Sequence, residues 1–315
     1  MDKYPEIEKI HKDIKDLNIQ GATNVAIATF EGMKLYADIS VVQDKELFYK
    51  EFFEVADRLA HARANEPLAT NGVNYVKNFF NKKFTVLPEL ATMKRELVSL
   101  TDDFLEIIGQ SKKDLIEKNG RFFSNYNKIF THCHSSTAVS LIKTIKQKKG
   151  NFEVVCTETR PRLQGRITAK NLLDARIKTT LIADSAAESF IINRGSVPVE
   201  IVFIGCDEMT QLGHAINKIG SWGIAMAAHY ADKPFYVVTP FLKLDLESHH
   251  HNIEIEIRES KELWEDAPKG LHMYNPAFEV VDKGLITGYV TELGILKPGD
   301  IKKAARENYP WLFTS

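Results

Sequence analysis

An alternation of short β-branched runs with helical stretches, which begins after Asn119-Gly120, constrains the fold more than any other feature of the sequence. Successive runs begin about 20 to 50 residues apart, which is the rhythm of strands joined by crossover helices in a parallel sheet. The expected strands lie at 128–131, 153–157, 179–183, 200–204, 235–239 and 285–290. We therefore expect an α/β domain built on a mainly parallel sheet.

The first part of the chain has a different pattern. Apolar residues recur at helical spacing from residue 2 to about 115, for example at Ile7, Ile10 and Ile14. Breaks at 19–24 and 62–67 each place a helix start after a turn, where backbone amides are exposed. A plain connection between helices is the alternative explanation of either break. We expect a helical domain over 1–118 and the sheet domain over 119–315.

Polar residues follow the predicted strands at their carboxyl ends. The clusters lie at 132–136, 158–162, 184–185, 206–208 and 240–243. Because the carboxyl ends of parallel strands share one edge of a sheet, these clusters should converge although they are scattered along the chain. That edge is the predicted functional site.

The stretch 199–221, which reads VEIVFIGCDEMTQLGHAINKIGS, combines an acid, an amide and a cation. Its apolar run ends at Gly205, Cys206 and Asp207 follow, and Asn217 and Lys218 come about ten residues later. This combination suits a site for an anionic ligand that exchanges protons. We predict that Asp207 is a catalytic acid or base and that Lys218 anchors the charge of the ligand.

Cys133 lies where a predicted strand ends and a helix capped by Ser135 and Ser136 begins. The helix dipole and the unpaired amides at that position favour the thiolate. A buried, inert thiol is the alternative, since that is the commonest state of a free cysteine. The flanking His132 and His134 could add positive charge or simply pack, and a histidine base beside Cys133 also leaves thiol hydrolysis as a lesser alternative.

Three cations are expected at the same edge, namely Arg160, Lys218 and Lys243. A guanidinium there suits a phosphate oxygen, and Gln164 adds a polar group to the same segment as Arg160. For any one of these cations a solvated surface position is the simpler explanation. Their gathering at one edge supports an anion site.

Composition excludes several classes of function. Forty-one Lys and Arg residues against 42 Asp and Glu give a net charge of −1, which favours neither nucleic acid nor a membrane surface as a partner. The amino terminus is charged from its second residue and lacks the apolar core of a signal peptide, so a cytoplasmic location is expected. Cys133, Cys156 and Cys206 are too few for a disulfide framework.

We expect neither a metal nor a cofactor. The run 248–251 contains three histidines but has no second ligand cluster to accompany it, so it is interpreted as a solvated loop. The chain lacks a G-x-G-x-x-G sequence after a strand and a G-x-x-x-x-G-K-[ST] phosphate loop, which argues against a dinucleotide or nucleoside triphosphate enzyme.

Several motifs in the same order resemble one known superfamily. They are THCHS at 131–135, TETRP at 157–161, GCD at 205–207 and INKIG at 216–220, with further support at 255–259, 274–279 and 291–295. Together they resemble the superfamily of ribose-1,5-bisphosphate isomerase, methylthioribose-1-phosphate isomerase and the regulatory subunits of translation initiation factor 2B. The likeness to ribose-1,5-bisphosphate isomerase is the closest, and it covers nearly all of residues 120 to 300.

The resemblance implies a Rossmann-like carboxyl-terminal domain that follows a helical domain. It also implies a metal-free aldose–ketose isomerisation of a pentose 1-phosphate, most simply ribose 1,5-bisphosphate to ribulose 1,5-bisphosphate in nucleotide salvage. The catalytic pair would be Cys133 and Asp207, with Asp207 as the acid at the ring oxygen and a Cys133 thiolate as the base at C2. A homo-oligomer, as a dimer or a trimer of dimers, is the expected assembly.

The resemblance also assigns residues that hold the substrate. These positions are Gln20, Gly21, Ala22, Thr23, Arg63, Ser135, Ser136, Thr137, Asn217, Lys218 and Lys243. Gln20 departs from the pattern, because both isomerase families usually have arginine there. Loss of a charged hydrogen bond costs about 1.5 to 3 kcal/mol, enough to change the preferred substrate. Alternatives are therefore an isomerase of a methylthio or deoxy pentose 1-phosphate, or a non-catalytic sugar-phosphate or nucleotide sensor similar to the initiation-factor subunits.

Overall fold

The structure is a computed structural model that describes residues 3–146, 152–248, 253 and 255–313. Contacts between Cα atoms divide the chain into two compact units. The helical unit comprises residues up to Gln110, Leu242–Leu246 and residues from Lys303, and the sheet unit comprises Ser111–Phe241 and Glu247–Lys302. The sequence suggested one continuous boundary at 118/119, whereas the units divide within a helix and the helical unit gains two later segments.

Distant contacts explain why those later segments belong to the helical unit. The Asn71 amide donates to the carbonyl oxygens of Leu242 and Leu244 at 2.8 and 2.7 Å. Trp311 packs edge-on against Tyr75, with ring centroids 5.2 Å apart. Hydrophobic periodicity describes only local structure, so the sequence pattern carried no sign of these contacts.

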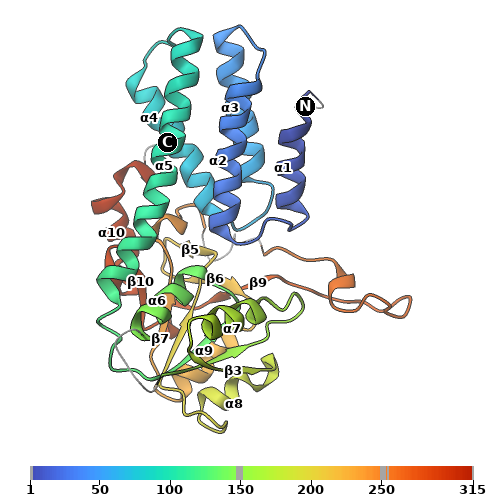
Figure 1. Cartoon of the computed structure of the whole chain (residues 1–315), viewed down its shortest axis with the longest axis vertical. Coiled ribbons are helices and arrows are strands. Elements are labelled where there is room, and N and C mark those ends of the chain that lie inside the picture. The colour runs from blue at the N-terminus through green and yellow to red at the C-terminus, as the bar shows by residue number, and fades with distance from the viewer. Residues whose placement is uncertain (1–2, 147–151, 249–252, 254, 314–315) are drawn as a thin grey trace. The chain divides into compact units, whose positions relative to one another are not determined.

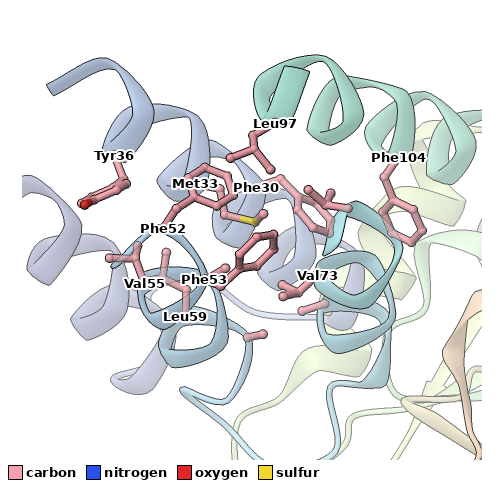
Figure 2. Packing of buried hydrophobic residues seen from close by; sticks show 14 of the residues in the cluster. Phe30, Met33, Tyr36, Phe52, Phe53, Val55, Leu59, Val73, Leu97 and Phe104 are labelled. Atoms are coloured by element: carbon pink, nitrogen blue, oxygen red, sulfur yellow. The ribbon is translucent and has the colours of Figure 1, made fainter. Parts of the chain in front are cut away.

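Amphipathic helices form the helical unit and pack around one apolar core (Figure 1). Figure 2 shows part of this core, in which Phe30 meets Phe104 edge-on with ring centroids 5.3 Å apart. Asp44 starts its helix by accepting the Leu47 N–H, and Pro67 occupies the first turn of the next helix, where a missing N–H costs nothing. The helices are α1 (Pro5–Lys15), α2 (Ala22–Ile39), α3 (Lys45–Ala60), α4 (Pro67–Lys83), the first two thirds of α5 (Leu90–Asn119) and most of α10 (Ile301–Asn308), and the strand β8 is Leu244–Asp245.

The sheet unit contains a large sheet with the strand order β11-β10-β7-β4-β1-β2-β3. Its strands are β1 (Lys128–His132), β2 (Glu153–Thr157), β3 (Lys178–Ile182), β4 (Ile201–Ile204), β7 (Phe235–Val238), β10 (Gly288–Thr291) and β11 (Gly294–Leu296). Neighbours run parallel except β11, which is antiparallel to β10. The central strands β2, β4 and β7 are buried throughout, as expected for a parallel sheet that is covered on both faces.

The mixed α/β class and the mainly parallel sheet predicted from the sequence are confirmed. Each of the predicted strands is present within one or two residues, apart from the last, which begins at Gly288 because 283–285 form a 3₁₀ turn. The helices that follow the strands are α6 (Ser136–Lys146), α7 (Gln164–Asp174), α8 (Ala187–Ile191) and α9 (Ser221–Tyr230). Among the described residues, we find no helix with the length and apolar character that crossing a membrane requires.

A smaller antiparallel arrangement in the sheet unit was missed by the sequence analysis. It joins β5 (Glu208–Thr210), β6 (Ala215–Lys218) and β9 (Phe278–Val281), with β6 in the middle. The chain turns between β5 and β6 at Gly213, whose φ of +85° lies in the region that favours glycine. The hairpin of β5 and β6 brings Asn217 and Lys218 back toward Asp207.

Candidate functional site

The carboxyl ends of β1 and β4 bring several predicted site residues together. Ser135 caps α6 by accepting the Ala138 N–H at 3.2 Å, which confirms its predicted capping role. A Cβ at Gly205 would lie 2.6 Å from the Ser135 Cβ and 3.8 Å from the Asn217 amide oxygen. Only glycine fits such a close approach, so Gly205 lets the end of β4 touch the start of α6.

Cys133 has an unusual backbone conformation at the end of β1. Its φ is +63°, in the left-handed region that costs a residue with a side chain about 1 to 3 kcal/mol. The His134 N–H donates a hydrogen bond to the sulfur. Such local strain is typical of residues that a protein holds in place for function.

The prediction that this position favours the thiolate is wrong. Burial is the largest cause of a rise in the pKa of the Cys133 thiol to about 11, and the charges of Asp207 and Asp184 contribute to that rise. The Lys218 ammonium and the His134 N–H lower the pKa but do not offset the burial. Desolvation outweighs the helix start, so the group at this site is a neutral thiol. The influence of three charged side chains on one sulfur also places them near it.

Asp207 lies in the connection between β4 and β5. Its N–H donates to the carbonyl oxygen of Ile216 at 2.9 Å, which joins it to the β5–β6 hairpin. The side chain is half-buried. The acid is therefore held by backbone pairing while its carboxyl group keeps access to solvent or a ligand.

Lys218 ends β6, with its ammonium 4.6 Å from the centre of the Phe278 ring. The preceding Asn217 is buried and donates to the Ser221 hydroxyl at 2.8 Å, and that hydroxyl donates to the Lys218 carbonyl oxygen at 2.7 Å. These bonds and the cation–π contact fix the turn into α9. Asn217 is thus a structural support of the cation's backbone.

The polar segment after β2 is held by hydrogen bonds that the sequence did not indicate. Arg160 is exposed and donates to the carbonyl oxygen of Leu263 at 3.0 Å. The backbone N–H groups of Thr159 and Arg160 donate to the two carboxylate oxygens of Asp184 at 2.7 and 2.6 Å. Gln164 begins α7, and its side-chain oxygen is buried without a hydrogen-bond partner among the described residues. That oxygen could accept a hydroxyl of a ligand.

The first turn of α6 carries the predicted residues Ser136 and Thr137. The Ser136 hydroxyl accepts from the Lys112 ammonium at 2.9 Å, and Thr137 is buried. The amides of a first helical turn have no partner within the helix, so this end suits an anion. Lys112 was missed because it lies on the long helix α5, where a lysine at helical spacing is an ordinary surface residue.

The remaining predicted positions lie in the helical unit. Gly21 has a φ of +84° directly before α2, so Ala22 and Thr23 form its first turn, as the break at 19–24 indicated. The Gln20 amide donates to the Leu17 carbonyl oxygen at 2.9 Å. Arg63 forms a buried ion pair with Glu66 at 3.2 Å.

Lys243, the other predicted residue of the helical unit, ends a 3₁₀ turn, Phe241–Lys243, at the border of the two units. Among the described residues, no group of three His, Cys, Asp or Glu side chains is placed to hold a metal ion. The histidine run 249–251 lies outside the described residues.

Sequence reasoning also missed Glu279 on β9. Its carboxylate accepts the N–H groups of Gly220 and Trp222 at 2.6 and 2.9 Å and so caps α9, directly after Lys218. Burial raises the pKa of this carboxyl group, although those N–H donors lower it. The motif that contains Glu279 was visible, but only the pairing of β9 with β6 shows what the carboxylate does.

Comparison with known proteins identifies the same superfamily that the sequence motifs resemble. The sequence pattern of the Initiation factor 2 subunit family matches residues 18–298. Ribose 1,5-bisphosphate isomerase of Methanocaldococcus jannaschii is 33% identical, over 99% of this chain and 98% of the relative. Methylthioribose-1-phosphate isomerase of Symbiobacterium thermophilum is 33% identical, over 92% of this chain and 84% of the relative.

A solved structure shares the fold. The crystal structure of the Pyrococcus horikoshii translation initiation factor eIF-2B superimposes with a TM-score of 0.79, at 23% identity, over 93% of this chain and 97% of that one. At that identity the likeness establishes the fold and leaves the chemistry to the residues of the site.

Proposed function

We propose, since the chain belongs to the Initiation factor 2 subunit family, that it converts ribose 1,5-bisphosphate to ribulose 1,5-bisphosphate. At the level of reaction class, the chain is a pentose-phosphate isomerase, as its curated relatives are. One observation supports the specific chemistry most strongly: the Cys133 thiol lies within the electrostatic influence of both Asp207 and Lys218. A proton donor, a carboxylate and a cation are the groups that this reaction requires.

The high pKa of the thiol favours Cys133 as the acid, which reverses the roles that the resemblance implied. A phosphate on the anomeric oxygen prevents simple opening of the sugar to an aldehyde. In our proposal the Cys133 thiol gives its proton to the ring oxygen, the bond from that oxygen to C1 breaks, and positive charge develops at C1. General acid catalysis of this kind contributes about 10²- to 10⁴-fold in rate.

Asp207 acts in the next step as the base. The positive charge at C1 acidifies the C2 proton, which the Asp207 carboxylate removes, and the electron pair forms the C1–C2 double bond of an enol phosphate. Asp207 then returns this proton to C1, while the Cys133 thiolate takes the proton of the 2-hydroxyl group and C2 becomes a carbonyl. Both groups end as they began, so no outside oxidant or reductant is needed.

In our proposal, cations and the backbone amides of first helical turns hold the phosphates of the substrate. Lys218 neutralises charge beside the reacting carbons, and the first turn of α6, with Lys112 donating to Ser136, offers amides and an ammonium to a phosphate. The unpartnered Gln164 oxygen, among the described residues, would accept a sugar hydroxyl. In the helical unit, the amides that begin α2 are a second candidate for a phosphate, without the arginine that the family usually supplies.

A substrate panel tests the assignment. Purified protein is offered ribose 1,5-bisphosphate, 5-methylthioribose 1-phosphate and 5-deoxyribose 1-phosphate, and kcat/KM is measured for each. We expect the bisphosphate to exceed the other two by about 10- to 100-fold, the value of one charged hydrogen bond to its 5-phosphate. Preference for a sugar without that phosphate contradicts the substrate. Binding of all three without turnover supports the sensor instead.

The pH dependence of kcat/KM tests whether the active enzyme needs Cys133 as the thiol or as a thiolate acting without a protonated Asp207. If Cys133 is the acid, the active form is the thiol, which is fully present below a pKa of about 11 and is lost as the pH rises through it. We therefore expect a flat profile from about pH 7 to 10 and a fall above it. A thiolate base that acts without a protonated Asp207 would instead give a tenfold rise for every pH unit over that range. Initial rates in buffers of constant ionic strength distinguish the flat profile from the rising one. A thiolate paired with a protonated Asp207 holds the same number of protons as the proposed pair and gives the same flat profile, so isotope effects rather than pH separate those two assignments.

A further inference from the structure

Threonine hydroxyls hold the backbone of Cys133 on both sides. Its N–H donates to the Thr159 hydroxyl at 3.0 Å, and its carbonyl oxygen accepts from the Thr168 hydroxyl at 2.7 Å. Both threonines are buried, at 0% and 1% exposure. They reach Cys133 from the end of β2 and from α7, so the left-handed residue is fixed by elements outside its own strand.

The hydrogen bonds on the N–H side can run in only one direction. His132 contacts the Ile219 carbonyl oxygen through Nε2 at 2.9 Å, and an oxygen of this kind only accepts, so Nε2 carries the proton. In the neutral ring Nδ1 then accepts from the Thr157 hydroxyl at 2.6 Å. Since that uses the Thr157 proton, the Thr159 hydroxyl must donate to Thr157, at 3.1 Å, which turns its lone pairs toward the Cys133 N–H.

The hydrogen bonds on the carbonyl side of Cys133 also run in only one direction, and there the proton lies on Nδ1 of the second histidine, His134. The Thr168 hydroxyl donates its proton to the Cys133 carbonyl oxygen, so the hydroxyl oxygen accepts a hydrogen bond from Nδ1 of His134 at 2.9 Å. His134 therefore carries its proton on Nδ1, the opposite tautomer to His132. Each histidine next to Cys133 in the sequence orients one threonine that is distant in the sequence.

Burial keeps His132 in the form that this network requires. Desolvation lowers the pKa of His132 to about 4, so it is neutral at physiological pH. The pKa of His134 is also lowered, by burial and by Lys112 and Lys143. His132 and His134 therefore do not add positive charge, which was one of the two alternatives that the sequence left open. The other alternative, simple packing, is also incomplete, because both rings make specific hydrogen bonds.

We propose that Thr159 and Thr168, oriented by His132 and His134, are positioning residues that hold Cys133 in its left-handed conformation and so aim its thiol. The proposal rests on the proposed function where it treats Cys133 as the catalytic acid. The hydroxyls do not act on the substrate. They set the direction of the Cα–Cβ bond, and a displacement of about 1 Å in a catalytic group can cost about 10²-fold in rate.

The test replaces each hydroxyl by a methyl group of the same shape, in Thr159→Val and Thr168→Val. We expect kcat to fall about 10²-fold with KM little changed. We also expect iodoacetamide at pH 8 to alkylate Cys133 about 10-fold faster, because a loosened peptide admits water and restores part of the thiolate. Peptide mass spectrometry assigns the label to Cys133.

Thr291→Val is the matched control. Thr291 is a fully buried threonine at the end of β10 that donates to the Gly294 carbonyl oxygen at 3.0 Å and accepts the Leu293 N–H at 3.1 Å. The Thr291→Val variant loses as many side-chain hydrogen bonds as Thr159→Val does, but at a position that does not contact Cys133. We therefore expect wild-type kcat and wild-type labelling. If the Thr159 and Thr168 variants match this control in both readouts, the proposal is overturned.

Serine variants separate positioning from general damage to the fold. Thr159→Ser and Thr168→Ser keep the hydroxyl and should retain near wild-type kcat and labelling, and they decide the matter if a valine variant does not fold. Serine variants as impaired as valine variants contradict the proposal. If wild-type protein isomerises none of the sugars but the labelling pattern appears as expected, the proposed function fails and the positioning role stands.

Discussion

Replacing Cys133 with serine is expected to lower kcat for ribose 1,5-bisphosphate by about 10²- to 10⁴-fold, the usual contribution of a general acid. The serine hydroxyl is a much weaker acid than the thiol it replaces, so it cannot protonate the ring oxygen at the same rate. The change removes no charge and little volume, and KM should stay within about 2-fold because uniform binding is intact. Steady-state kinetics on the purified variant measure both quantities.

Cys156→Ala provides the control for loss of a thiol. Cys156 lies inside β2, fully buried, and burial raises its pKa to about 12, so it has no access to a ligand. We expect this variant to lose stability by about 1 kcal/mol for the lost packing and to keep wild-type kcat. A Cys133→Ser protein that is as active as Cys156→Ala would remove Cys133 from the mechanism.

Most of the large sheet could be predicted because its central strands are nearly continuous apolar runs. A buried parallel strand such as β4 has no polar face, so its sequence stands out against the helices around it. The strands β5, β6 and β9 differ from it because they carry polar residues such as Asn217 and Glu279. Their pairing depends on contacts between distant segments, which a single sequence does not display.

The convergence of several polar side chains at one edge of the sheet was predictable, and their chemistry was less so. Polar residues at the ends of parallel strands converge by topology, and Cys133, Ser135, Gly205 and Asp207 do so. The ionisation of Cys133 was predicted wrongly, because a helix start is visible in the sequence whereas desolvation is a property of the folded chain. For the same reason, no pattern indicated that Thr159 and Thr168 contact the backbone of Cys133.

Replacing Asp207 with asparagine is expected to lower kcat by about 10²- to 10⁴-fold, because an amide cannot take the C2 proton. The control is Glu158→Gln, which removes one negative charge from the same edge of the sheet. Glu158 forms a surface ion pair with Arg166 at 3.2 Å, worth little in stability, so its variant should keep kcat within about 2-fold. If both variants lose activity equally, the effect is one of overall charge rather than of a base.

Substrate deuterated at C2 separates the roles of the catalytic pair, because each variant should slow a different step. In Asp207→Asn the removal of the C2 proton becomes rate-limiting, so a large primary isotope effect on kcat is expected. In Cys133→Ser the opening of the ring becomes rate-limiting and precedes any cleavage at C2, so the isotope effect should vanish. The reverse pattern would assign the base to Cys133 and the acid to Asp207, and would show that substrate binding overcomes the burial that raises the pKa of the thiol.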